Sequence, residues 1–130
     1  MEELPEGTFG PVTFLRISIY NSEIRTLHPS VVLSSKDRLE DVIIQWSQLE
    51  GFPFEILPDL TQLLVLDLTG NSLTSVPSLQ SFSLQELYLR SNNIANIEGN
   101  WSTPGLKYLY LGEYHVFRTA ICVIPVSQAI

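Results

Sequence analysis

The side chains best suited to chemistry in this sequence are few and lie far apart. The histidines are His28 and His115, and neither stands at a meaningful spacing from a serine, cysteine or carboxylate partner. Nucleophilic catalysis requires such a pair within hydrogen-bond reach, so no catalytic triad is predicted. We expect His28, which follows a leucine and precedes a proline, to be an exposed turn residue.

Three acids, Asp41, Asp67 and Glu86, fall at related places in the sequence and are expected to lie near one another. Paired carboxylates can exchange protons in catalysis, but solvated surface acids account for them more simply. The sequence contains no H-E-x-x-H motif, no P-loop and no G-x-G-x-x-G motif. Cys122 is the only cysteine, so it forms no internal disulfide and is expected to be a small buried apolar side chain. We therefore predict a protein that is not an enzyme, with no metal site and no cofactor.

Composition points to a folded chain that avoids anionic partners. Of its 130 residues, 45% are hydrophobic and 16% charged, as in a globular protein with room for one domain. Its 14 acidic and 7 basic residues give a formal charge of −7. This charge repels a phosphate backbone, and no cluster of Lys and Arg offsets it, so a nucleic-acid partner is not expected.

Aliphatic residues recur in a fixed order along most of the chain. The segments LLVLDLTGNSL and LQELYLRSNNI, which start at residues 63 and 84, follow the pattern L-x-x-L-x-L-x-x-N-x-L. Three less regular copies start near residues 14, 39 and 106. Successive starts are 25, 24, 21 and 22 residues apart, within the range of roughly 20–29 residues that leucine-rich repeats show. Five copies in register predict a repeat domain over residues 1–112.

The alternation within each copy is typical of a short strand with one buried face. We therefore predict an α/β-type leucine-rich repeat solenoid, with a short parallel sheet on the concave face and little helix. Prolines in each connection predict loops and short turns on the convex face. The segment 28–38 alone has the length for a short helix. A second apolar set is expected to close each turn: Leu27, Phe52, Phe54, Leu57, Val76, Leu79, Ile97 and Trp101.

The polar residue after each strand is expected to form a ladder. Asn71 and Asn92 occupy this place in the two regular copies, and Ser22 and Ser47 occupy it in the first two. An asparagine can bond backbone N–H and C=O groups that would otherwise be buried without partners. A serine can do part of this with one hydroxyl group.

The ends of the repeat series are expected to differ. Leu4, Phe9 and Val12 can cover the first repeat, with a turn at Gly10-Pro11. Residues 113–130 read as an atypical tail: Tyr114 replaces the ladder residue, His115 falls in a disrupted repeat, and 120–124 are apolar with high β-propensity. Two interpretations stay open, an improvised cap on a divergent last repeat or the end of a truncated repeat protein.

The outward positions of the strands define the surface where a partner is expected. Tyr88, Tyr108 and Tyr110 should be neighbours, with Arg90 beside them and Asp67 one strand away. Tyrosine and arginine are enriched in binding hot spots because they bury a large area and keep a polar tip. The alternative is that exposed tyrosines merely suit β-structure. We predict binding of another protein or peptide at these residues.

Three segments, which begin LPEGTFG, LEDVIIQ and LQELYLR, resemble arthropod leucine-rich-repeat proteins commonly named after the non-catalytic subunit of oplophorus-luciferin 2-monooxygenase, a secreted shrimp luciferase complex. The resemblance covers about residues 4–112. It implies an accessory subunit that does not carry out the light reaction, and it implies secretion. Members generally have a secretion signal and a cysteine-bearing N-terminal region, whereas MEELPEGTFG shows neither. The sequon Asn100-Trp101-Ser102 is a glycosylation site only on the secretory route.

Overall fold

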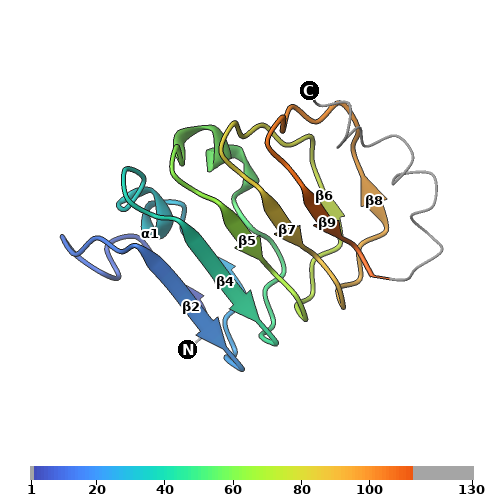
Figure 1. Cartoon of the computed structure of the whole chain (residues 1–130). Coiled ribbons are helices and arrows are strands. Elements are labelled where there is room, and N and C mark those ends of the chain that lie inside the picture. The colour runs from blue at the N-terminus through green and yellow to red at the C-terminus, as the bar shows by residue number, and fades with distance from the viewer. Residues whose placement is uncertain (1, 113–130) are drawn as a thin grey trace.

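The computed structural model describes residues 2–112, which coil into a parallel β-solenoid (Figure 1). One strand per turn joins a five-stranded sheet in the order β2-β4-β5-β7-β9, and all four pairings are parallel. The strands are β2 (Arg16–Tyr20), β4 (Asp41–Gln45), β5 (Val65–Asp67), β7 (Glu86–Tyr88) and β9 (Tyr108–Tyr110). The predicted leucine-rich repeat solenoid with five parallel rungs and little helix is confirmed.

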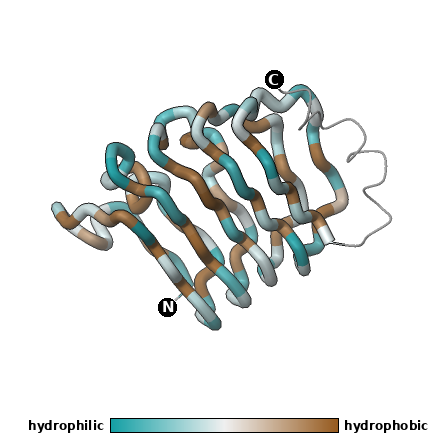
Figure 2. Tube along the Cα trace, viewed as in Figure 1, coloured by the Kyte–Doolittle hydropathy of each residue, from teal (hydrophilic) through white to brown (hydrophobic). Residues whose placement is uncertain are grey.

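Aliphatic side chains in register across the sheet make a linear core. In the central row Val42, Leu66 and Leu87 pair in turn and are each 0% exposed. Brown segments run along the rungs in Figure 2. Outward Ile43 and Val65 add apolar residues to β4 and β5, whereas the outward residues of β7 and β9 are polar or aromatic. The second apolar set lies on the convex side and is buried as expected, except that Ile97 is only partly buried.

The convex side is more regular than its prolines suggested. Two pairs of two-residue parallel strands form there, β1 (Glu3–Leu4) with β3 (Thr26–Leu27) and β6 (Ser75–Val76) with β8 (Asn96–Ile97). Buried residues such as Leu27 and Val76 bring successive turns close enough for their backbones to form β-sheet hydrogen bonds. The convex face, which was predicted to be mostly loops and short turns, therefore also contains these short strands.

Two short helices complete the convex side. The helix α1 (Ser30–Leu33) lies within the segment predicted to hold one. A 3₁₀ helix, η1 (Phe54–Asp59), was not predicted, because Pro53 and Pro58 suggested an irregular loop. Its bonds span three residues, as from Ile56 N–H to the Pro53 carbonyl at 3.1 Å, and this tight coil accommodates both prolines.

The polar ladder bonds backbone groups between and within turns. The Asn71 amide Nδ2 donates to the carbonyls of Ile44 and Leu68 at 2.7 and 2.9 Å, and its Oδ1 accepts the Leu49 N–H at 3.2 Å. Asn92 repeats the arrangement one turn later, and its Oδ1 accepts the Leu73 N–H at 3.0 Å. In the second repeat the Ser47 hydroxyl accepts the Ser22 N–H at 3.1 Å.

The N-terminal segment covers the first turn only in part. Leu4 is buried, and the Phe9 ring packs edge-on against Phe14 with centroids 4.9 Å apart. Gly10 adopts a φ of 59° in the expected turn. Val12 is 51% exposed, so its predicted place in the cap was wrong. Because it lies just past the turn on the way to β2, its side chain stays outside the core.

Residues 113–130 lie outside the described residues. The expectations for Tyr114, His115, Cys122 and the apolar segment 120–124 fall there. The division of the chain at residue 112 and the two interpretations of the tail stay predictions.

Replacing Asn71 by Ala tests the ladder. The substitution leaves the buried Leu49 N–H without its acceptor and removes the amide that holds Ile44 and Leu68, so we expect a loss of about 2–3 kcal/mol in the free energy of unfolding. Ser47→Ala is the milder control and should cost about 1 kcal/mol. Urea unfolding followed by circular dichroism measures both losses. Equal losses would contradict the claim that asparagine stabilises the ladder more than serine does.

Candidate functional site

The outward residues of the sheet form three rows, which we call the concave face. The register aligns the first row as Arg16, Asp41, Val65, Glu86 and Tyr108. The second row is Ser18, Ile43, Asp67, Tyr88 and Tyr110. The third row consists of Tyr20 and Gln45, the last residues of β2 and β4, and of Thr69, Arg90 and Gly112, each two residues past the end of its strand. The paired rows are those that the repeat spacing assigned.

Tyr88, Tyr108 and Tyr110, hereafter the tyrosine cluster, meet at the C-terminal side of this face. The rings of Tyr88 and Tyr110 are stacked across β7 and β9, with centroids 4.8 Å apart and planes 1° from parallel. The Tyr108 ring lies 6.3 Å from that of Tyr110 at 15°. Tyr108 and Tyr110 are nevertheless 51% and 41% exposed. The cluster is therefore ordered by contacts among its own rings while much of its aromatic surface faces solvent.

A carboxylate on the same face of the sheet holds one ring of the cluster. The Tyr88 hydroxyl donates to Glu86 Oε1 at 2.6 Å, two residues back on β7. This hydrogen bond to Glu86, with smaller contributions from desolvation and nearby negative charge, raises the pKa of Tyr88 from 10.0 to about 12. The protonated phenol donates to Glu86, and its ring is stacked on that of Tyr110.

The other acids of the concave face each have a different partner. Asp41 Oδ2 lies 2.8 Å from Arg16 Nη2 in an ion pair. Asp67 accepts the Gln45 amide at 2.6 Å and the Thr69 N–H at 3.0 Å. Asp41, Asp67 and Glu86 do lie on adjacent strands, but within residues 2–112 no hydrogen bond joins two of these carboxylates. They are arranged as separate surface acids rather than as a proton-sharing pair.

Two predicted binding residues flank the cluster. Asp67 lies opposite Tyr88 in the register, one strand away as expected. Arg90 follows β7 and is exposed, and its carbonyl accepts the Gly70 N–H at 2.9 Å. No hydrogen bond or ion pair of the described residues joins the Arg90 guanidinium to the tyrosine cluster. The structure thus brings four of the five predicted residues together, whereas the Arg90 side chain forms no bond to them within the described part of the chain.

An aromatic residue that sequence reasoning missed lies at the opposite side of the surface. Trp46 follows β4 with a φ of 51° and is 55% exposed. Its ring lies over Gly70, where an added Cβ would come within 2.3 Å of the indole. Trp46 and Gly70 each directly precede a ladder residue. The sequence could have predicted this contact, because a glycine at the position equivalent to a tryptophan of the preceding repeat indicates that the indole packs closely on the backbone.

His28 has a serine partner that its sequence spacing did not predict. The His28 Nδ1 lies 2.9 Å from the Ser30 hydroxyl and accepts the Ser30 N–H at 3.1 Å. His28 is exposed next to the turn at Pro29, as expected, and Ser30 is its neighbour two residues along the chain. Both contacts are local, and they hold the turn that begins α1.

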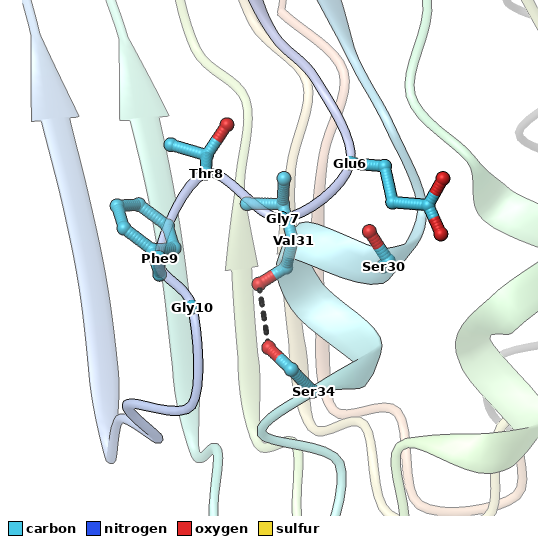
Figure 3. Close-up of a pocket in the computed structure, with 8 residues that line it drawn as sticks. All are labelled: Glu6, Gly7, Thr8, Phe9, Gly10, Ser30, Val31 and Ser34. Carbon is cyan, nitrogen blue, oxygen red and sulfur yellow. Dashed lines mark hydrogen bonds between the residues drawn. The ribbon is translucent and has the colours of Figure 1, made fainter.

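A shallow cavity lies beside this helix. It has a volume of about 230 Å³ and opens between the loop of residues 6–10 and α1 (Figure 3). Ser30 and Ser34 line it, and the Ser34 hydroxyl donates to the Val31 carbonyl. Pockets for small organic ligands usually have roughly 300–1,000 Å³, so the concave face is the stronger candidate site.

Other kinds of site find little support in the described part. Residues 2–112 contain no group of three or more His, Cys, Asp and Glu side chains placed to hold a metal ion. Within the same range, no helix is long and apolar enough to cross a bilayer.

Asn100 is exposed in the loop after β8 with a φ of 61°, while Trp101 of the sequon is buried. Glycosylation of Asn100 stays a prediction.

Comparisons with known proteins agree on the repeat. A family model described as leucine rich repeat matches residues 37–94. The chain is 34% identical over 95 residues to the oplophorus-luciferin 2-monooxygenase non-catalytic subunit of Oplophorus gracilirostris, covering 72% of this chain and 26% of that protein. It is 32% identical over 127 residues to podocan-like protein 1 of Mus musculus, covering 93% and 22%, respectively. It is also 31% identical over 121 residues to tsukushi of Gallus gallus, covering 91% and 33%, respectively.

The chain thus spans between 22% and 33% of the length of these three relatives. No solved structure matches it significantly.

The raised pKa of Tyr88 predicts a pH dependence of stability. A group whose pKa is higher in the folded state contributes stability that is complete below its unfolded pKa near 10 and is lost as the pH rises through about 12. We expect tyrosinate absorbance to show a last step near pH 12 that disappears in Tyr88→Phe. Glu86→Gln keeps an acceptor but removes the charge, so it should lower that midpoint. A single step near pH 10 in protein still folded by circular dichroism would contradict this assignment.

Proposed function

Because the chain is a leucine-rich-repeat protein, we propose that it is a non-catalytic module that captures another protein or a peptide on its concave face. The observation that carries this proposal is the stacked tyrosine cluster, ordered and yet about half exposed on β7 and β9. Soluble proteins seldom leave several large aromatic side chains together in solvent unless a partner covers them.

The geometry of the cluster favours binding on energetic grounds. Tyr88 is held by Glu86 and by the ring of Tyr110, so little side-chain entropy remains to be lost when a partner docks. Rigid aromatic anchors of this kind contribute strongly at interfaces. The strand backbones beneath are fixed by parallel pairing, which keeps the anchors in place.

Further exposed aromatic residues extend the surface across the sheet. Trp46 and Tyr20, at the ends of β4 and β2, are 55% and 52% exposed. A partner that spans from Tyr110 to Trp46 crosses β9, β7, β5 and β4, which is about 14 Å at the usual strand spacing. An extended peptide of about five residues covers that distance. The absence of a catalytic role is part of the same proposal and is supported by the separately partnered acids.

Selection from a random peptide library displayed on phage tests the proposal without a known partner. The immobilised 130-residue chain is the bait, and the affinity of each recovered peptide is measured by calorimetry. We expect peptides whose affinity falls at least about tenfold in Tyr110→Ala, as for a hot-spot residue. Phe82→Ala is the matched control, because Phe82 is 85% exposed but lies in a loop outside the sheet.

The control decides the outcome. Peptides that bind Tyr110→Ala and the unsubstituted chain equally would show that the concave face is not the binding surface. Peptides lost equally in Phe82→Ala would show nonspecific aromatic contact, which also overturns the proposal. Melting temperatures of the variants confirm that each still folds.

The similarity to the Oplophorus subunit favours a second candidate, an accessory subunit of a luciferase-like monooxygenase complex. For the whole protein this role and the implied secretion are proposals, since the chain covers 26% of that relative. Sedimentation of the chain with the catalytic subunit of the Oplophorus complex tests the role. A stable complex supports it, and independent sedimentation of the two proteins rejects it.

A further inference from the structure

We propose that the concave face recognises a cationic segment of its partner, with an arginine or lysine side chain laid against the tyrosine cluster. This inference rests on the proposed binding function and names the chemistry of the partner. It follows from the combination of exposed aromatic faces with acids that form no ion pair within residues 2–112.

The ion pairs of the concave face are unevenly distributed. Arg16 neutralises Asp41 at the β2 side of the sheet, with 2.8 Å between Nη2 and Oδ2. Asp67 and Glu86, the acids nearest the tyrosine cluster, bond only neutral groups in the described part of the chain: the Gln45 amide, the Thr69 N–H and the Tyr88 hydroxyl. No Lys or Arg side chain of residues 2–112 neutralises these two carboxylates, so a cation of a partner can pair with them.

The stacked rings supply the second half of the site. A guanidinium or ammonium group is attracted to the face of a tyrosine ring, and the attraction grows when the contact is partly desolvated. Tyr108 and Tyr110 expose half or nearly half of their surface, and Tyr110 bridges the other two rings. A cation lying on this surface has Glu86 within the same cluster and Asp67 on the next strand.

The titration of Tyr88 reports the same negative field. The hydrogen bond to Glu86 is the largest cause of the raised pKa of Tyr88, and the negative charges of Glu86 and Asp67, on two neighbouring strands, add smaller contributions. The whole chain adds to this field with its formal charge of −7, which favours the approach of basic rather than acidic partners. The local geometry and the overall charge thus favour the same class of partner.

Arg90 provides an internal check on the idea. It is an exposed cation two residues beyond Tyr88, and no ion pair among residues 2–112 neutralises it. Its charge opposes an incoming cation, so its removal should strengthen binding. A site that instead selected acidic or neutral peptides would show the opposite response or none.

Two synthetic peptides serve as probes, an acetylated and amidated heptapeptide Gly-Ser-Arg-Ser-Arg-Ser-Gly and its twin with citrulline in place of both arginines. Citrulline keeps the shape of arginine but carries no charge. Binding to the 130-residue chain is followed by the NMR shifts of the tyrosine ring protons. We expect the arginine peptide to bind about tenfold tighter than the citrulline peptide, as a partly desolvated cation–π contact with nearby acids predicts.

Five variants locate the effect. Glu86→Gln keeps the acceptor for Tyr88 but should weaken the arginine peptide about fivefold, whereas Glu55→Gln, an equal charge change in η1, should not. Tyr110→Leu should weaken binding because it removes the aromatic face, while Tyr110→Phe should retain it. Arg90→Gln should tighten binding.

The results separate this inference from the proposed function. Equal binding of both probes, or equal effects of Glu86→Gln and Glu55→Gln, would overturn the inference that the site recognises a cationic segment. If library peptides without Arg or Lys still depend on Tyr110, the inference fails and the binding function stands. If no peptide depends on Tyr110, both fail.

Discussion

The fold depends on how each turn satisfies the backbone groups that it buries. A solenoid turns its chain inward once per repeat, and this brings N–H and C=O groups into an apolar interior where an unpaired group is costly. One asparagine amide solves the problem for two turns at once: Asn71 donates to carbonyls of its own turn and of the preceding one, and it accepts an N–H from the latter. Leucines supply most of the buried area, but the ladder fixes the distance and register at which they stack.

That register is what turns a sequence pattern into a surface. Since the rungs pair residue by residue, side chains 22 residues apart in sequence, such as Tyr88 and Tyr110, become direct neighbours. Their rings then stack, and Glu86 holds the hydroxyl of one of them. The same pairing places Arg16 beside Asp41 and Gln45 near Asp67. The concave face is thus a set of cross-strand contacts, each of which follows from the repeat length.

The sequence predicted whatever follows from period and alternation: the five rungs, the inward leucines, the residues of each row and the meeting of the tyrosines. It failed where contacts depend on local backbone path. The prolines predicted a loop at η1, but the tight turns of a 3₁₀ helix accommodate proline. The two-residue strands on the convex side arise from stacking of turns and have no pattern of their own. The contact between His28 and Ser30 depends on the local turn. The contact between Trp46 and Gly70 depends on the left-handed backbone of Trp46. The spacing of the repeats predicts neither contact.

The contact between Trp46 and Gly70 gives the repeats a fixed order. A tandem copy of the repeat that begins at residue 39 would set a second tryptophan where Gly70 now lies, and its Cβ would collide with the first indole. Although the rungs share one architecture, these two neighbouring rungs therefore differ at one equivalent position, with tryptophan in the first and glycine in the second. Duplication of this unit would require the exposed Trp46 side chain to move, whereas copying the two units together keeps the contact between tryptophan and glycine.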